Sequence, residues 1–187
     1  MVLASQVKEL LVVFGTVQAQ DLTQWRGSVE LPLHVQRYYQ EVGPVDITIP
    51  GYGNPYFFPS LAKLWELQEG YRWSSPTSEQ DPDWNDDWLV VGTEGADPFI
   101  TGCHAEIVWQ ASHAAEGWDL IEFFPDINSM IACLAQLGII VVSAGEGFTD
   151  EYSCIQEEYI ELAHHKLSEL LGSQTKAQEA LALIGWV

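Results

Sequence analysis

The amino-acid sequence predicts an α+β domain whose sheet is mainly antiparallel. Its 187 residues fit one domain, or one domain with an appended element. A composition that is 47% hydrophobic and 12% aromatic is typical of a chain that buries a core. Helical patterns occur near both ends and strand patterns lie between them, whereas a parallel sheet would need alternating strands and helices. These observations favour helices packed against an antiparallel sheet.

Two helices are expected before the first strand. Apolar residues at helical spacing predict a helix over residues 5–19: Leu3, Val7, Leu10, Leu11 and Phe14. A second helix is expected to begin at Leu31-Pro32, because proline suits the first turn of a helix. Gly43-Pro44 then ends it.

Short apolar and β-branched runs predict the strands, which we place at residues 45–50, 88–91, 107–109 and 120–124. The last two are expected to join across Gly117. A short helix is predicted over residues 61–70. Glycine and proline mark a turn after the second run, at Gly92, Gly95 and Pro98. Residues 74–87 are polar, acidic and rich in turn formers, so they are expected to form a surface loop.

The C-terminal third is mostly helical in pattern. Asp126 is a suitable N-cap for a helix that Gly138 is expected to close. Residues 139–142 form a short β-branched run, and an amphipathic helix is predicted over residues 149–171 with a short helical tail near residues 176–184. We therefore divide the chain into residues 1–138 and a helical extension, residues 139–187, packed on the same domain.

The charge balance is strongly acidic. Seven Lys and Arg face 27 Asp and Glu, which gives a formal net charge of −20. Binding to nucleic acid or to an anionic membrane relies on basic side chains, so neither is expected. An acidic surface attracts a basic partner or a cation, and it also keeps a protein soluble without any partner. No signal peptide or membrane span is expected, and three widely spaced cysteines suit a reducing cytoplasm.

Motifs for catalysis, metals and cofactors are missing or incomplete. No phosphate-binding loop, GxSxG or HExxH occurs. The remaining enzyme alternative is a metal-dependent hydrolase that uses carboxylates with His164 or His104, or a thiol pair of Cys103 with His104 or His113. Glu161 and His164 make only one of the two Glu-x-x-His units that a di-iron site needs. We therefore expect no catalytic residue, no metal and no cofactor.

Aromatic residues among carboxylates suggest a protein interface instead. A tryptophan ring contributes buried area, and neighbouring acids contribute steering and specificity. Trp84 either serves as such a contact or packs back to anchor its own loop. The predicted partner-binding residues are Asp81, Asp83, Trp84, Asp86, Asp87, Glu94 and Asp97.

Scattered positions between residues 20 and 138 also form a family pattern: Leu31-Pro32 with Tyr38, Tyr39 and Gly43; Leu61, Leu64 and Trp65; Trp88-Leu89-Val90-Val91-Gly92 followed by Gly95-Ala96-Asp97-Pro98; Ile107-Val108-Trp109; and residues 123–137. In these positions the chain resembles the SUKH superfamily, which includes a fungal cell-wall-synthesis regulator and many bacterial toxin-immunity proteins.

The resemblance implies helices against a strongly bent antiparallel sheet and a role without catalysis. That role is often to neutralise a toxin, frequently a nuclease, delivered by a neighbouring cell. An acidic protein suits the basic groove of a nuclease. A housekeeping regulator or scaffold of the same fold is the alternative. The sequence departs from the family pattern in its long acidic loop and in the segment after Gly138, which puts the choice of partner in doubt.

Overall fold

The computed structural model describes residues 2–74, 77, 79–112 and 118–187. Its centre is a six-stranded antiparallel sheet in which each strand pairs with the next along the chain, in the order β1-β2-β3-β4-β5-β6. The strands are Ile47–Ile49, Tyr56–Phe58, Trp88–Glu94, Asp97–Gly102, Val108–Ser112 and Asp119–Phe124. Helices α1 (Ala4–Leu11) and α2 (Leu33–Glu41) precede the sheet, and α3 (Ile127–Ala144), α4 (Glu157–Leu171) and α5 (Gln174–Leu183) follow it. This arrangement confirms the predicted α+β class.

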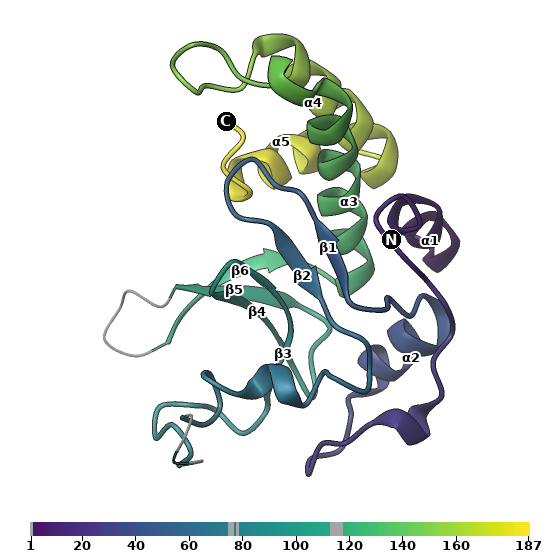
Figure 1. The fold of residues 1–187 in the computed structure, drawn as a ribbon, viewed down its shortest axis with the longest axis vertical. Coiled ribbons are helices and arrows are strands. Elements are labelled where there is room, and N and C mark those ends of the chain that lie inside the picture. Colours follow the sequence, from purple (N-terminus) through teal and green to yellow (C-terminus); the bar gives the residue numbers. More distant parts are fainter. Residues whose placement is uncertain (1, 75–76, 78, 113–117) are drawn as a thin grey trace.

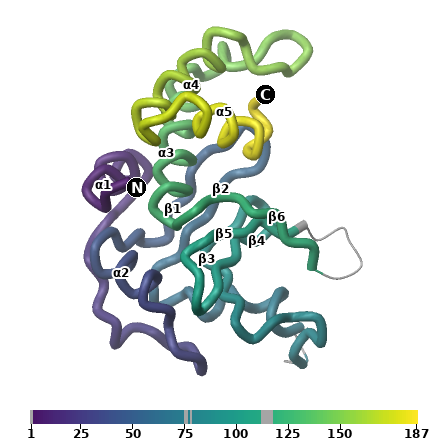
Figure 2. Tube along the Cα trace, turned by 180° about the vertical axis from the view of Figure 1, so that it is seen from behind, coloured from purple at the N-terminus to yellow at the C-terminus, as the bar shows by residue number. Residues whose placement is uncertain are grey.

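Helix α3 connects the sheet to the C-terminal helices (Figures 1 and 2), and α1 lies beside it in both views. The predicted end of this helix at Gly138 is wrong, because the helix continues to Ala144 and includes the β-branched run. Gly138 allows β1 to pack closely against the helix, because a Cβ at this position would lie 2.4 Å from Cγ2 of Ile49. The division at residue 138 therefore falls inside a helix, and one buried core contains residues from both sides of it.

The first helix is shorter than predicted because tertiary pairing takes over its second half. It ends at Leu11, and the chain that follows runs alongside the segment after α2. The N–H of Gln18 donates to the Gly43 carbonyl (2.9 Å), and the N–H of Val45 donates to the Thr16 carbonyl (3.0 Å). The C-terminal amphipathic helix also begins later than predicted, at Glu157, after a loop that contains Ser153 in a left-handed conformation (φ 65°).

The predicted turn at Gly92 lies inside β3 instead. A Cβ on Gly92 would approach the Phe58 ring to 2.6 Å, so the glycine allows close packing within the sheet. The turn itself is made at Gly95, whose φ is 56°. Strand β2, with only three residues between turn formers, was not predicted. The short helix expected over residues 61–70 is reduced to one 3₁₀ turn, Glu66–Gln68. The expected connection at Gly117 lies outside the described residues.

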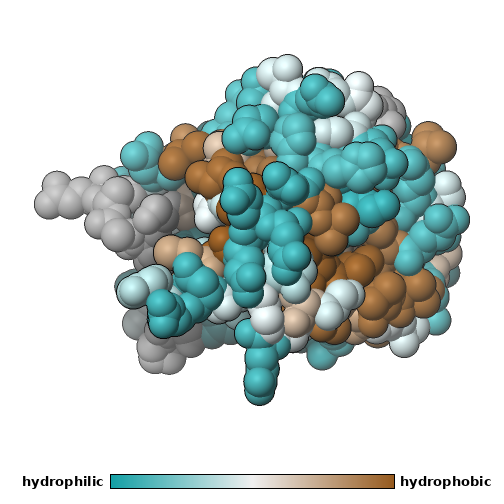
Figure 3. Space-filling view, turned by 90° about the horizontal axis from the view of Figure 1, so that it is seen from above, coloured by the Kyte–Doolittle hydropathy of each residue, from teal (hydrophilic) through white to brown (hydrophobic). Residues whose placement is uncertain are grey.

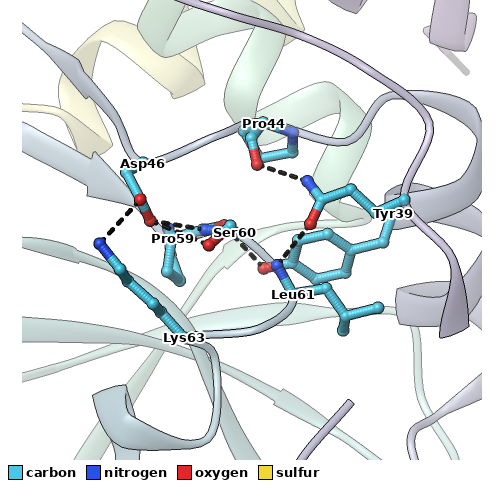
Figure 4. A network of polar contacts seen from close by, with 8 residues as sticks. Tyr39, Pro44, Asp46, Pro59, Ser60, Leu61 and Lys63 are labelled. Atoms are coloured by element: carbon cyan, nitrogen blue, oxygen red, sulfur yellow. Dashed lines mark hydrogen bonds and ion pairs between the residues drawn. The ribbon is translucent and has the colours of Figure 1, made fainter. Parts of the chain in front are cut away.

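A polar network fixes the segment that leaves β2 (Figure 4). The Asp46 carboxylate accepts hydrogen bonds from the Ser60 N–H (3.0 Å) and from Nζ of Lys63 (2.8 Å). The buried Tyr39 hydroxyl donates to the Pro59 carbonyl (3.1 Å). Asp46 itself has a left-handed backbone (φ 52°), a strain that these contacts hold in place. These hydrogen bonds therefore fix the position of the backbone where the chain leaves β2 and enters the segment after residue 59.

Within the described residues, one helical stretch, Ile127–Gly147, has the length and apolar composition of a membrane span. However, 61% of its most apolar window is buried inside the protein, as in the central helix of a core. The end of the molecule formed by α4 and α5 is seen in Figure 3, where brown apolar areas alternate with teal hydrophilic ones. Exposed apolar side chains in this part of the chain are Val142 near the end of α3, Leu162 in α4, Leu183 in α5 and Val187 after α5.

Candidate protein-binding face

The two faces of the sheet contact different parts of the chain. Leu89, Val91 and Phe99 point into the main core, which the helices complete. Val90, Ile100 and the other alternate residues point to the opposite face, as the two-residue period of a strand requires. Aromatic side chains from the strands themselves and from the segments beside them gather on that second face. We define the tryptophan face as Tyr71, Trp84, Trp88, Trp109 and Trp118.

Trp84 is the centre of this face. Its ring meets Trp88 edge to face (5.4 Å between centroids, 88° between planes) and Trp118 in the same way (5.2 Å, 89°). Tyr71 lies 6.0 Å from Trp118. Trp84 is only 5% exposed, whereas the other four side chains are partly exposed. A layer of half-buried aromatic rings, which have few rotatable bonds, is well suited to a protein contact.

The chain between β2 and β3 lies over this face and hydrogen-bonds to the sheet through its side chains. Strand β2 is short and pairs only with the end of β3, at Thr93 and Glu94. Gln68, which is fully buried, fills part of the gap: its Nε2 donates to the Val90 carbonyl (2.9 Å) and its Oε1 accepts from the Val90 N–H (2.9 Å). The amide thus takes the place of a neighbouring strand and satisfies two backbone groups.

Arg72 continues the same arrangement and sets the acidic loop in place. Its side chain is 9% exposed. It donates to the Trp88 carbonyl (3.3 Å), to the Asp86 carbonyl (3.2 Å) and to the Asp86 carboxylate (3.0 Å). The guanidinium also lies 5.8 Å from the centroid of the Trp65 ring, which meets Trp25 edge to face and lies tilted against Trp73. One buried cation therefore holds the acidic loop against the sheet.

The loop acids predicted from the sequence have different roles. Asp86 is bound by Arg72 and by Nε2 of Gln80 (2.8 Å). Asp81 is half-buried and accepts from the N–H of Asp83 (2.8 Å), which shapes the turn. Asp83 and Asp87 are exposed, and no described residue donates a hydrogen bond to either carboxylate. Only these last two acids present unpaired charge to a partner.

Glu94 and Asp97 form a separate site. They lie at the hairpin between β3 and β4, whereas the acidic loop precedes Trp88 at the other end of β3. Six residues at ~3.3 Å each separate the two ends by roughly 20 Å. Glu94 is half-buried and accepts from Nε2 of Gln110 (2.8 Å). Burial raises the pKa of the Glu94 carboxyl, and the nearby Asp97 raises it further.

Of the two roles considered for Trp84, a contact for a partner or an anchor for its own loop, the structure favours the anchor. Its ring packs under its own loop instead of projecting from it, and its Nε1 has no hydrogen-bond partner among the described residues. Tyr71, Trp109 and Trp118 also belong to the face, and they were not predicted from the sequence. The abundance of tryptophan, eight in this chain, was the available signal.

The geometry gives little support to the enzyme alternative, which is a thiol–histidine pair or a metal-dependent hydrolase. Cys103 is partly buried, burial raises the pKa of its thiol, and no hydrogen bond joins it to His104 in the described structure. His113 lies outside the described residues. Glu161 is exposed on α4 near His164, and no group of three or more His, Cys, Asp or Glu suited to a metal ion occurs among the residues described. Searches of protein-family models, curated proteins and solved structures gave no match to the chain.

Proposed function

We propose that this chain is a non-catalytic protein-binding domain of the SUKH type, acting in the cytoplasm as an immunity protein that neutralises a basic toxin domain. One observation carries the proposal. The carboxylates of Asp83 and Asp87 accept no hydrogen bond from the described residues, and they lie in the loop next to the partly exposed rings of the tryptophan face. Charge attracts the partner over a distance, and aromatic area stabilises the docked complex.

The fold supports the same proposal. The resemblance implies helices packed on an antiparallel sheet, and the chain has N-terminal helices, a continuous antiparallel meander and a long helix directly after the last strand. The acidic loop is one of the two parts that depart from the family pattern, and the segment after Gly138 is the other. In immunity proteins such variable surfaces set partner specificity, so this loop is the proposed contact.

The mechanism that we propose is electrostatic occupation of a basic groove. The net charge of −20 attracts a basic domain at a rate that depends on salt, because exposed charges are screened over about 8 Å at physiological ionic strength. Asp83 and Asp87 then lie where phosphates of a nuclease substrate would lie. A nuclease toxin held in this way is excluded from its substrate.

The test begins with a pull-down from the native host, followed by kinetic measurements on the purified partner. The double substitution Asp83→Lys and Asp87→Lys is expected to slow association by about tenfold or more and to reduce its salt dependence. Asp86 is left intact because its removal would disturb the buried Arg72.

The matched control is Glu161→Lys with Glu179→Lys, an equal change in charge on exposed positions of α4 and α5. It should affect association much less than the loop variant. A partner that is not basic, or equal effects of the two double variants, would reject the loop as the docking surface. Growth of cells that express the partner toxin should depend on this protein, and growth without it would reject the immunity role.

A further inference from the structure

The two edges of the sheet differ in how far the rest of the chain covers them. Strand β1 forms one edge with three residues, and its two isoleucines are buried in the core. Strand β6 forms the other edge, beside β5 (Figure 2). Its last two residues, 123 and 124, are buried, whereas residues 119–122 are exposed or partly exposed. No described strand pairs with the outer side of β6.

The hydrogen bonds of Val90 show which backbone groups of β6 point outward. Residues opposite each other in antiparallel strands either bond to each other or both point away from each other. Both backbone groups of Val90 bond to Gln68, so the opposite residue, Ile100, points its groups toward β5. Ile100 therefore bonds to Trp109, and the groups of Trp109 point away from β6. The residue of β6 opposite Trp109 is Glu122, whose N–H and C=O must then point outward from the edge of the sheet.

Two residues of β6 therefore offer free backbone groups. Leu120 lies two residues before Glu122 in a regular stretch of the strand, so its groups point the same way. No described residue donates a hydrogen bond to these outward carbonyls or accepts one from these outward N–H groups. An extended peptide that adds a strand to a sheet edge bonds to N–H and C=O groups in this spacing. The free edge of β6 is therefore suited to main-chain recognition.

The side chains along the same stretch determine which peptide fits. Ile121 is 59% exposed, although it is a large apolar residue. Asp119 and Glu122 are exposed on either side of it, and neither carboxylate accepts a hydrogen bond from the described residues. A strand that pairs here places a side chain opposite each of these residues, at ~5 Å between Cβ atoms. The best fit is therefore an apolar residue opposite Ile121 and a cation opposite each acid.

A second copy of this chain is a poor occupant of the edge. Its β6 has the same two acids and no Lys or Arg, so any register brings carboxylates together without a cation. Neighbouring side chains of paired strands lie closer than the ~8 Å over which physiological salt screens charge, and like charges on paired strands are destabilising. The acids therefore protect the edge against pairing with copies and favour a basic strand from a different protein.

We propose that β6 binds an extended basic segment of the protein partner by antiparallel strand addition. The backbone of that segment hydrogen-bonds to Leu120 and Glu122, and an apolar side chain covers Ile121. Lys or Arg lies opposite Glu122 and opposite Asp119. The basic character of the partner rests on the proposed function. The surface is a different one, because two strands separate β6 from β3, which the acidic loop precedes.

The probe is the capped hexapeptide acetyl-TKVVKT-amide, whose lysines face the two acids and whose valines face the two residues between them. Binding to the full chain is followed by NMR shifts and by hydrogen exchange. The peptide should bind with a Kd on the order of 1 mM. It should also protect the amides of Leu120 and Glu122 from exchange, because these amides have no partner without it. A control peptide with N-methyl groups on its second and fourth residues, which face Glu122 and Leu120, should bind at least about tenfold more weakly.

An exchange of charge tests the side-chain contacts. Asp119→Lys with Glu122→Lys should weaken the basic peptide by about tenfold and should bind acetyl-TEVVET-amide, which the unmodified chain binds about tenfold more weakly than the basic peptide. Glu161→Lys with Glu179→Lys, on α4 and α5, is the matched control and should leave the affinity unchanged. Leu120→Pro removes one outward N–H and no bond to β5, so it should keep the fold and weaken the basic peptide at least about tenfold.

The proposal is overturned if the basic peptide does not bind, if N-methylation or acidic residues in the peptide make no difference, or if the shifts fall on the acidic loop instead of β6. It is also overturned if the chain dimerises through β6, which sedimentation would show as a mass that rises with concentration and stays that of a monomer in the Leu120→Pro protein. The loop variant Asp83→Lys with Asp87→Lys should bind the peptide as the unmodified chain does. A failure of the acidic loop as docking surface and a failure of β6 are therefore distinguishable.

Discussion

The two faces of the sheet are closed by different kinds of structure. On one face, α1, α2 and α3 bury an aliphatic and phenylalanine core in which Phe99 stacks between Phe58 and Phe123. On the other, the chain between β2 and β3 covers the strands with the buried side chains of Trp84, Gln68 and Arg72, which lie beside half-exposed tryptophans of the strands themselves. Both faces of the sheet are shielded from solvent, one by helices and the other mainly by loop segments.

The difference separates stability from recognition. A helix satisfies its own backbone and needs only apolar contacts to pack, so the helical face contributes to stability with few specific polar contacts. The tryptophan face depends on a few long side chains, each of which satisfies several backbone groups. Local opening is expected first where contacts are few and individually important. Loops of that kind are also where binding residues concentrate.

Cysteine labelling should show the largest difference between the faces. Cys133 is fully buried in α3, and Cys103 is partly exposed beside the acidic loop, where its N–H donates to the Asp87 carbonyl. In a Cys154→Ser protein, a thiol reagent should modify Cys103 at least about a thousand times faster than Cys133, because Cys133 reacts only after global unfolding costing ~5 kcal/mol or more. Similar rates for the two thiols would mean that the helical face opens as readily as the other.

Removal of the Gln68 amide should have the next largest effect. Gln68→Met leaves the N–H and C=O of Val90 without their partner, so the free energy of unfolding should fall by about 2–4 kcal/mol in urea titrations. Gln178→Met on the exposed side of α5 is the matched control and should change it by less than about 0.5 kcal/mol. A loss below about 1 kcal/mol for Gln68→Met would show that the side-chain pairing contributes little.

The smallest effect concerns Glu94. Because its pKa is raised in the folded protein, the folded state binds its proton more tightly than the unfolded chain, and stability falls as the pH rises through this range. Glu94→Gln should therefore raise the Tm slightly at pH 7. The gain should disappear as the pH falls below 4.5, the ordinary value for this carboxyl. Glu122→Gln, at an exposed position of β6, is the matched control, and equal changes in Tm for the two variants at every pH would reject a specific role of Glu94.

Local patterns in the sequence were sufficient for the fold class and for most strands, because period and turn residues report directly on strands such as Leu89 to Val91. They failed where tertiary contact decides the structure. Gly138 has the signature of a helix end, yet it is a packing position against Ile49. Likewise, no local pattern indicates that Gln68 reaches Val90 or that Arg72 reaches Asp86, since both contacts join segments more than ten residues apart.

The candidate site was predictable only in its composition. The sequence identified an acidic loop with a tryptophan, and the structure divides its acids by role. Asp86 is a structural ligand of Arg72, whereas Asp83 and Asp87 remain unpaired. Glu94 and Asp97 belong to another end of the sheet because strand length separates them, which charge patterns alone do not reveal.

The part of β3 that β2 does not reach has a consequence for how the protein behaves at high concentration. An open strand edge of this kind offers unpaired N–H and C=O groups on which a strand from another molecule can add, and this is a common start of aggregation. Here Gln68 and Arg72 occupy those groups with side chains, which form no continuous ladder. Copies of the chain therefore have no template at this edge, and a protein partner has to bind through side chains instead of adding a strand there.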